Sequence, residues 1–183
     1  LKKLEQINGI EWIRLHYAYP LSFPGDVLDV MSQSDKICNY LDIPFQHISD
    51  PLLKSMTRAI GEEASRKLLH EIRERLPGIA MRTTLLVGYP GETDDDFSKL
   101  VNFVEESRFE RMGVFAYSSE EGTSCYELKD DVPDEVKQQR LEKILEVQQS
   151  ISLEINEKKI GKTYRVIIDG KEGGITTGRT EYD

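Results

Sequence analysis

The stretch that decides the fold is residues 79–93, which read IAMRTTLLVGYPGET. Residues 79–87 are rich in apolar and β-branched side chains, a composition typical of a buried strand. A loop that contains two glycines follows, and Thr93 with Asp96 has the spacing of a helix capping box. The stretch therefore predicts a strand over residues 79–87, then a loop, then a helix.

The same order of elements recurs on both sides of this stretch. We expect further strands over residues 9–15, 40–43 and 112–117. We expect helices beginning at an acidic N-cap, Asp26, and at Ser49-Asp50-Pro51, the latter interrupted at Gly61. Strands that alternate with helices in this way lie parallel and are joined by right-handed crossovers. The fold class is therefore α/β, and because four such units cannot close a TIM-type barrel, we expect the later half of a (β/α) barrel or an open sheet.

The pattern changes after Pro133. Residues 135–159 predict a long charged helix, and residues 162–169 and 175–180 predict two short strands with a turn at Gly170. The expected apolar stripe of the helix is Val136, Leu141, Ile144, Leu145, Gln148, Ile151 and Ile155. We expect three parts: a β/α domain over residues 1–132, a linker helix over 133–160 and the truncated start of a small β module over 161–183.

Composition narrows the function classes. A formal net charge of −9 argues against a protein whose main task is to grip nucleic acid, and it suits a basic or neutral partner, although many cytosolic enzymes are simply acidic. No apolar run is long enough to span a membrane and no signal-peptide pattern opens the chain, so we expect a cytoplasmic protein. The chain also begins without methionine, which suggests a piece of something longer.

The two cysteines, Cys38 and Cys125, lie far apart in the sequence. They lack the spacing of a cysteine-based zinc or iron–sulfur site, so we expect two buried, reduced thiols and no metal ligands.

Polar residues follow each predicted strand, where parallel β/α folds bind their ligands. Gln46 and Ser49 offer hydrogen bonds for ribose hydroxyls or an amino-acid carboxylate, although Ser49 and Asp50 could equally cap a helix. His47 alone is a weak signal, because a lone histidine is often a structural hydrogen-bonding group.

The glycine loop and the strand before it hold three more candidates. Gly88 would let a ligand approach the backbone closely, with a plain tight turn as the alternative. Glu92 would either shape the site or serve only as helix N-terminal charge. Arg82, expected to be buried in its strand, needs an anionic partner, either a ligand carboxylate or an acid such as Asp42 or Glu92.

Three segments together resemble the radical S-adenosylmethionine (SAM) methylthiotransferases. They are residues 40–50 (YLDIPFQHISD), residues 82–93 (RTTLLVGYPGET) and residues 113–123 (GVFAYSSEEGT). The similarity is greatest to the branch that modifies an aspartate of a small-subunit ribosomal protein, the RimO family. It covers essentially the whole chain.

The resemblance implies SAM as cofactor and 4Fe–4S clusters in the parent enzyme, whose CxxxCxxC ligands are absent from this chain. It also implies a methylthio group added to the aspartate β-carbon, a C-terminal TRAM barrel, a ribosomal protein substrate rather than tRNA, and a monomer. A tRNA adenosine methylthiotransferase, a non-catalytic platform for a ribosomal protein and another TIM-like enzyme remain alternatives.

The resemblance further implies cofactor-binding roles but no catalytic role for residues of this chain. Gln46 and Ser49 would reach the ribose or methionine part, and Arg82 would pair with a carboxylate or brace the pocket. The segment Gly88 to Glu92 would shape the adenine side, with Phe115 and Tyr117 beneath the base.

Overall fold

The structure is a computed structural model that describes residues 1–123 and 125–182. Its elements in chain order are α1 (Lys2–Glu5), β1 (Ile13–Leu15), α2 (Gly25–Ser32), β2 (Ile37–Asp42), α3 (Asp50–Ser55), α4 (Glu62–Arg75), β3 (Ala80–Val87), α5 (Asp94–Ser107), β4 (Arg111–Ala116), α6 (Asp134–Glu157), β5 (Ile167–Glu172) and β6 (Ile175–Arg179).

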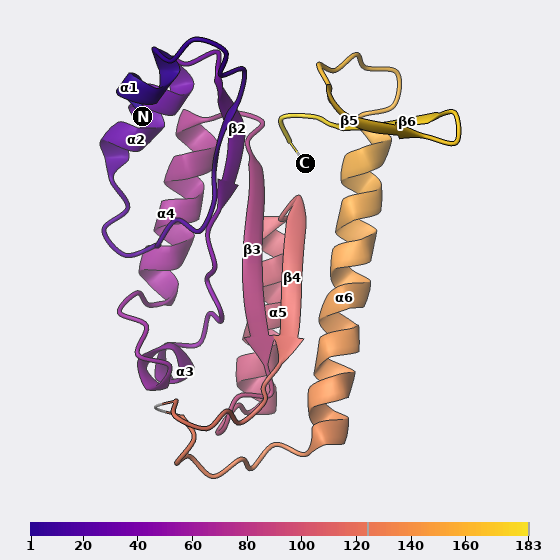
Figure 1. Cartoon of the computed structure of the whole chain (residues 1–183). Helices are drawn as coiled ribbons and strands as arrows, with labels where there is room; N and C mark the ends of the chain where they lie inside the picture. Colours follow the sequence, from indigo (N-terminus) through magenta and orange to yellow (C-terminus); the bar gives the residue numbers. More distant parts are fainter. Residues whose placement is uncertain (124, 183) are drawn as a thin grey trace.

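Strands β1 to β4 form one parallel sheet in sequence order (Figure 1). The longest ladder joins β3 to β4, with Thr84 opposite Gly113 and Leu86 opposite Phe115. Asp42 of β2 lies opposite Arg82 of β3. Sequential parallel strands joined by helices are the arrangement of a partial (β/α) barrel, so the predicted fold class is confirmed.

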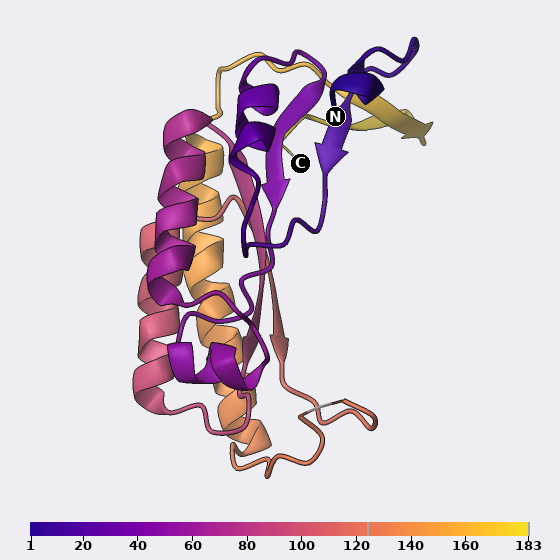
Figure 2. The same ribbon diagram turned by 90° about the vertical axis from the view of Figure 1, so that its left-hand side faces the viewer.

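Helices cover only one face of this sheet, as the side view in Figure 2 shows. Along β3 the residues that face the helices, such as Met81 and Leu85, are buried, whereas Arg82, Thr84 and Leu86 on the opposite face are half-buried. Alternation of this kind follows from the two-residue period of a strand. The face that would form the inside of a closed barrel is therefore open.

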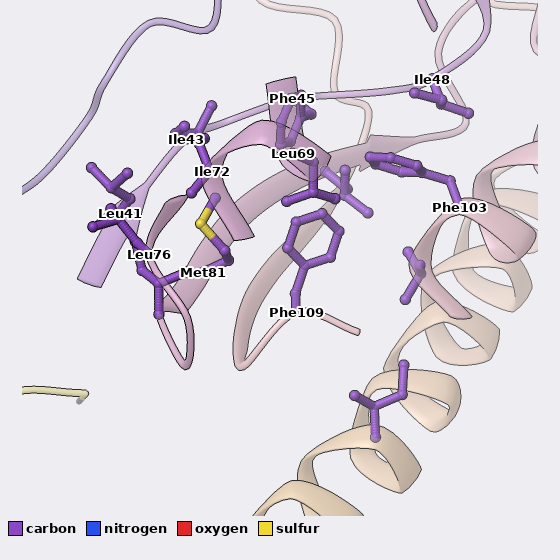
Figure 3. Packing of buried hydrophobic residues seen from close by; sticks show 14 of the residues in the cluster. Leu41, Ile43, Phe45, Ile48, Leu69, Ile72, Leu76, Met81, Phe103 and Phe109 are labelled. Atoms are coloured by element: carbon purple, nitrogen blue, oxygen red, sulfur yellow. The ribbon is translucent and has the colours of Figure 1, made fainter. Parts of the chain in front are cut away.

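Three phenylalanines hold the centre of the core beneath the helices (Figure 3). Phe103 of α5 has its ring centroid 5.8 Å from that of Phe45 and 5.6 Å from that of Phe109, both in edge-to-face contact. All three side chains are essentially inaccessible to solvent. Because Phe45 lies in the segment after β2 and Phe109 lies two residues before β4, this cluster ties α5 to the segments next to both strands.

Helix α6 connects the two ends of the sheet (Figure 1). It begins near the carboxyl ends of the strands, packs along α5 and β4, and leads to the antiparallel hairpin β5–β6 at the opposite end. The segment after β6 returns to the sheet, where Arg14 donates to the Thr180 carbonyl at 3.0 Å and the Asn39 amide donates to Glu181 at 3.1 Å.

Several predicted boundaries were wrong. Strand β1 is shorter than expected, and β2 begins at Ile37 rather than Tyr40. Asp26 does not cap α2, because the helix starts one residue earlier with Pro24 as N-cap, which leaves Asp26 in the first turn. The Thr93–Asp96 capping box is confirmed. The Asp96 backbone amide donates to the Thr93 hydroxyl, and the Thr93 backbone amide donates to the Asp96 carboxylate.

The C-terminal hairpin was also misplaced along the chain. Strand β5 begins at Ile167 rather than Lys162, and Gly170 lies inside it at a register irregularity. The turn is made by Gly173 and Gly174, both with positive φ, because a tight hairpin favours residues that tolerate that conformation.

Two smaller expectations concern the cysteines and membrane spans. Cys38 and Cys125 are both free thiols, as predicted, but only Cys38 is buried, and Cys125 is half-buried. Among the described residues, no helix combines the length and the apolar character that crossing a bilayer requires.

We predict that Phe103→Ala lowers the free energy of unfolding by about 3–5 kcal/mol, because it removes the central ring of the core and leaves a cavity. Phe115→Ala is the matched control, since the Phe115 side chain is 60% exposed on the open face and its loss should cost under about 1 kcal/mol. Urea unfolding of the full-length protein measures both. Equal losses would contradict this assignment of the core.

Candidate functional site

The candidate site lies at the carboxyl ends of the strands, where the segments after β2, β3 and β4 meet. Its centre is the side chain of Glu92, which has no solvent exposure. The Glu92 carboxylate accepts hydrogen bonds from the Gly88 amide and from His47 Nε2, the latter at 3.3 Å, and pairs with the Arg140 guanidinium at 3.2 Å. One buried carboxylate thus joins the segment after β2, the loop after β3 and helix α6.

Hydrogen bonding fixes the protonation of His47. The Ser49 amide donates to His47 Nδ1 at 3.0 Å, so Nδ1 must be the bare nitrogen of the ring. The hydrogen therefore sits on Nε2 and points at Glu92. His47 is a neutral ring that orients the carboxylate, and the negative charge of Glu92 is balanced by Arg140.

Arg140 is nearly as buried as its partner, with 7% of its side chain exposed. Besides Glu92, its guanidinium donates to the Glu92 carbonyl at 3.1 Å and to Asp94 at 2.8 Å. The several donors of one planar group thus hold both the end of the loop and the start of α5. Arg140 is therefore the main contact from α6 to this loop.

The Ser49 side chain bonds to α5 and does not point into solvent. Its hydroxyl donates to Asp96 Oδ1 at 2.5 Å, and Thr93 contributes a second hydroxyl to the same carboxylate at 2.6 Å. Burial acts to raise the pKa of Asp96, but these hydrogen bonds outweigh it and hold that pKa below its usual value. Ser49 is also the N-cap residue of α3, although its side chain makes no capping bond there.

Packing within the protein provides one reason for glycine at position 88. Gly88 has a φ of +71°, and a Cβ built there would lie 2.2 Å from Cγ of Lys137. The space that a Cβ would occupy is filled by a side chain of this protein, so the glycine makes room for Lys137. The expected approach of a ligand to the Gly88 backbone stays a prediction. Gly91, with a φ of +84°, has open space where a Cβ would stand.

Lys137 is a second buried cation on α6, with 5% of its side chain exposed. Its ammonium group pairs with Asp130 at 2.5 Å and Asp134 at 3.2 Å, and it lies 5.5 Å from the centre of the Tyr117 ring. Burial acts to lower the pKa of Lys137, but the two carboxylates outweigh it and raise that pKa. The helix therefore supports the glycine loop at two points.

Tyr117 is part of this packed layer. It is 6% exposed, meets the Tyr89 ring edge-on at 5.3 Å and donates its hydroxyl to the Cys125 carbonyl at 3.2 Å. Burial raises the pKa of the Tyr117 phenol. Its ring shares a small apolar cluster with Leu52 and Tyr89.

Two of the remaining candidates, Arg82 and Phe115, face the open side of the sheet. Arg82 pairs with the buried Asp42 at 3.0 Å, so of the partners considered the internal acid Asp42 is the one found. The expectation that Arg82 is buried was wrong, because its side chain is 40% exposed on the uncovered face. Phe115 is 60% exposed, and Gln46 is half-buried with a φ of +69°.

The structure therefore separates the seven candidates. The packed layer beneath the loops contains Ser49, Gly88, Glu92 and Tyr117, and the open face carries Arg82 and Phe115. Gln46 is half-buried where the segment after β2 bridges to Leu85 of β3.

Sequence reasoning missed Lys137 and Arg140. The signal was present in the helix period, since the buried residues of α6 are Lys137, Arg140, Ile144, Gln148 and Ile151. These positions form one continuous stripe, and extending it toward the N-terminus from Ile144 reaches the two cations. Leu145, expected in the stripe, is 45% exposed.

Comparison with known proteins settles the family. Residues 1–104 match the model of the Radical SAM superfamily. The chain belongs to this superfamily. Strands β1 to β3 and the loops after β2 and β3 lie within the matched region.

Curated relatives and one solved structure agree with this. Proteins described as "Ribosomal protein uS12 methylthiotransferase RimO" from Flavobacterium psychrophilum and Christiangramia forsetii are 59% and 57% identical over all of this chain. The chain covers 42% and 41% of their lengths. Coproporphyrinogen III oxidase (HemN) from Escherichia coli, a radical SAM enzyme, matches with a TM-score of 0.57 and 25% identity over 79% of this chain and 32% of that one.

Radical SAM chemistry also uses an iron–sulfur cluster, and the residues present here do not fit one. Across residues 1–123 and 125–182, no three His, Cys, Asp or Glu side chains gather where they could hold a metal. The two cysteines stand far apart in the sequence. No step of the chemistry is therefore assigned to a cluster held by these residues.

We predict that Gly88→Ala destabilises the full-length protein by more than Gly91→Ala. Both introduce a side chain at a positive φ, which costs about 1–2 kcal/mol, but only the first also strikes Lys137. Adding Lys137→Ala to Gly88→Ala should recover part of the extra loss in the free energy of unfolding that Gly88→Ala causes relative to Gly91→Ala. Urea unfolding provides the comparison, and equal losses for the two glycines would show that the contact with Lys137 is unimportant.

Proposed function

We propose that the whole protein to which this chain belongs is a radical SAM methylthiotransferase acting on ribosomal protein uS12, where it adds a methylthio group to the β-carbon of an aspartate. The observation that carries the proposal is the 59% identity to a protein named for that activity, over the entire chain. The negative net charge of the chain supports it, because ribosomal proteins are basic and opposite charges speed the association of two proteins.

Within that activity, this chain provides the later half of the radical SAM barrel and one side of the cofactor pocket. Three candidates outside the packed layer fit parts of SAM. The exposed ring of Phe115 is suited to the adenine base, the Arg82 guanidinium to a carboxylate, and the Gln46 amide to ribose hydroxyls. If bound here and cleaved by one electron from an iron–sulfur cluster held by other parts of the whole protein, SAM would supply the deoxyadenosyl radical that abstracts hydrogen from the substrate.

The other four candidates take supporting roles in this proposal. Glu92 and Ser49 hold the loops beside the pocket in place through their buried hydrogen bonds. Gly88 admits Lys137, and Tyr117 packs beneath the loop instead of offering a free face. These residues exclude water and fix the backbone that the cofactor would contact, and none of them transfers a proton.

The same proposal extends to the domain organisation, the oligomeric state and the cellular location of the protein. Residues 1–132 form the later part of the radical SAM domain, residues 133–160 the linker helix and residues 161–183 the start of a TRAM module. Helix α6 and the hairpin β5–β6 support this division. A monomer in the cytoplasm accords with a ribosomal protein substrate.

Mass spectrometry of modified substrates tests the proposal. Full-length protein, reconstituted with iron and sulfide under reducing conditions with SAM, should add one methylthio group to uS12 at a single aspartate and none to tRNA. Replacing the target aspartate by asparagine should abolish the product. Modification of tRNA adenosine with uS12 unchanged would instead establish the tRNA-modifying activity and overturn the proposal.

A further inference from the structure

The open face of the sheet carries a row of polar side chains across β1, β2 and β3. Register places Asp42 beside Arg82, and Arg82 Nη1 donates to Asp42 Oδ2 at 3.0 Å. On the other side of Asp42, His16 Nδ1 lies 3.7 Å from the same carboxylate oxygen. Tyr40, two residues before Asp42, faces the same way, and the Arg14 guanidinium lies over its ring at 4.6 Å.

Solvent exposure differs within this row. The Asp42 side chain is 3% exposed, whereas those of His16 and Arg82 are 52% and 40% exposed. A ligand that approaches the open face therefore meets the ring and guanidinium nitrogens before it meets the acid. Although the chain carries a formal net charge of −9, this part of its surface is suited to an anion.

A cavity of about 220 Å³ opens on the β1 side of the row. We call it the Arg14 cavity, and its lining is Trp12, Arg14, His16, Cys38, Ile167 and Arg179. None of the described residues in that lining is acidic. Sites for cofactors and drug-sized ligands measure about 300–1,000 Å³, so this cavity suits a short side chain better than SAM.

Arg14 supplies the cavity with a positive charge. It forms no ion pair with residues 1–123 or 125–182, and the acceptor that it does bind, the Thr180 carbonyl at 3.0 Å, is uncharged. Arg179, by contrast, donates to both carboxylate oxygens of Asp169, at 2.6 and 2.8 Å. Since a guanidinium has five N–H donors, Arg14 keeps donors for a ligand.

The proposed reaction brings two carboxylates to the open face, one from SAM and one from the target aspartate. Arg82 on β3 suits the first. Strands β1 and β3 flank β2 and lie about 9–10 Å apart, so a second carboxylate at the Arg14 cavity would not share the same cation. The hydrogen to be removed is on the β-carbon, which is bonded to the carboxyl carbon. Holding that carboxylate therefore positions the C–H bond that reacts.

We propose that Arg14 and His16 bind the side-chain carboxylate of the target aspartate. The inference rests on the proposed function and deepens it by naming the residues that recognise the substrate side chain. In the complex, Arg14 donates to the carboxylate, and His16 as imidazolium donates from Nε2 to the substrate while Nδ1 stays beside Asp42. Asp42 is then a positioning residue that orients the ring.

Calorimetric titration of reconstituted full-length enzyme tests this assignment, with uS12 and with uS12 carrying asparagine in place of the target aspartate. Wild type should bind the aspartate form about 10- to 100-fold more tightly, as expected for hydrogen bonds to a charged group. The variant Arg14→Gln, His16→Gln keeps polar side chains but lacks their charge, so it should bind both forms equally. Equal binding by wild type, or a full preference in the variant, would overturn the inference.

Control variants separate recognition from folding and from general charge. Lys67→Gln, His70→Gln removes similar side chains from exposed positions on α4 and should keep the wild-type preference for the aspartate form. Arg14→Lys, which keeps the charge, should retain most of it. Should the double variant fail to fold, His16→Gln alone, at an exposed position, should lower the preference severalfold. An equal loss in the α4 control, or no loss in His16→Gln, would contradict the assignment.

Titration with SAM distinguishes the two sources of carboxylate. Arg14→Gln, His16→Gln should bind SAM as tightly as wild type. A tenfold loss of SAM affinity with the aspartate preference intact would assign these residues to SAM and overturn the inference. The proposed function fails by a different result, which is wild-type enzyme that leaves uS12 unmodified. Wild type that modifies uS12 while binding both of its forms equally would overturn the inference alone.

Discussion

The candidate site depends on the contacts that the buried, charged Glu92 carboxylate makes with its neighbours. A carboxylate without solvent is tolerated only when it is paired and hydrogen-bonded, and here the Arg140 guanidinium, the Gly88 amide and the His47 ring meet those needs. Because these partners come from three separate segments, satisfying one charge also fixes the segments relative to one another. Loops that would otherwise be mobile at the strand ends become part of the packed structure.

This constraint divides the sheet into two functionally different faces. Beneath the loops, helices α4, α5 and α6 give a close-packed core around Phe103. The opposite face has no covering layer and presents Arg82 and Phe115 to solvent. A half-barrel with a rigid rim and an open inner face suits a chain that forms one side of a cofactor pocket. Helix α6 leads from the loop end of the sheet to the hairpin β5–β6 at the opposite end.

Much of this could be predicted from the sequence, and the failures have physical causes. Strand β3, its loop and the capped start of α5 follow from local periodicity and capping chemistry, which neighbouring residues determine. The pairing of Arg140 with Glu92 and the contact of Lys137 with Gly88 join residues far apart in the chain, and local patterns do not encode which distant side chain fills a space. The hairpin turn failed because Gly170 competes with Gly173-Gly174 as a turn signal, and only strand pairing decides between them.

Hydrogen exchange at the Gly88 amide tests the central role of Glu92 most directly. In wild type this amide should exchange slowly, since it donates to a buried carboxylate. Glu92→Gln should speed its exchange by about 10- to 100-fold, as expected from weakening a hydrogen bond to a charged group worth ~1.5–3 kcal/mol, and should also loosen the Ser49 amide through His47. The Leu76 amide at the end of α4 should not change. A Gly88 amide that exchanges like an open loop in wild type, or that is unaffected by the substitution, would contradict the account.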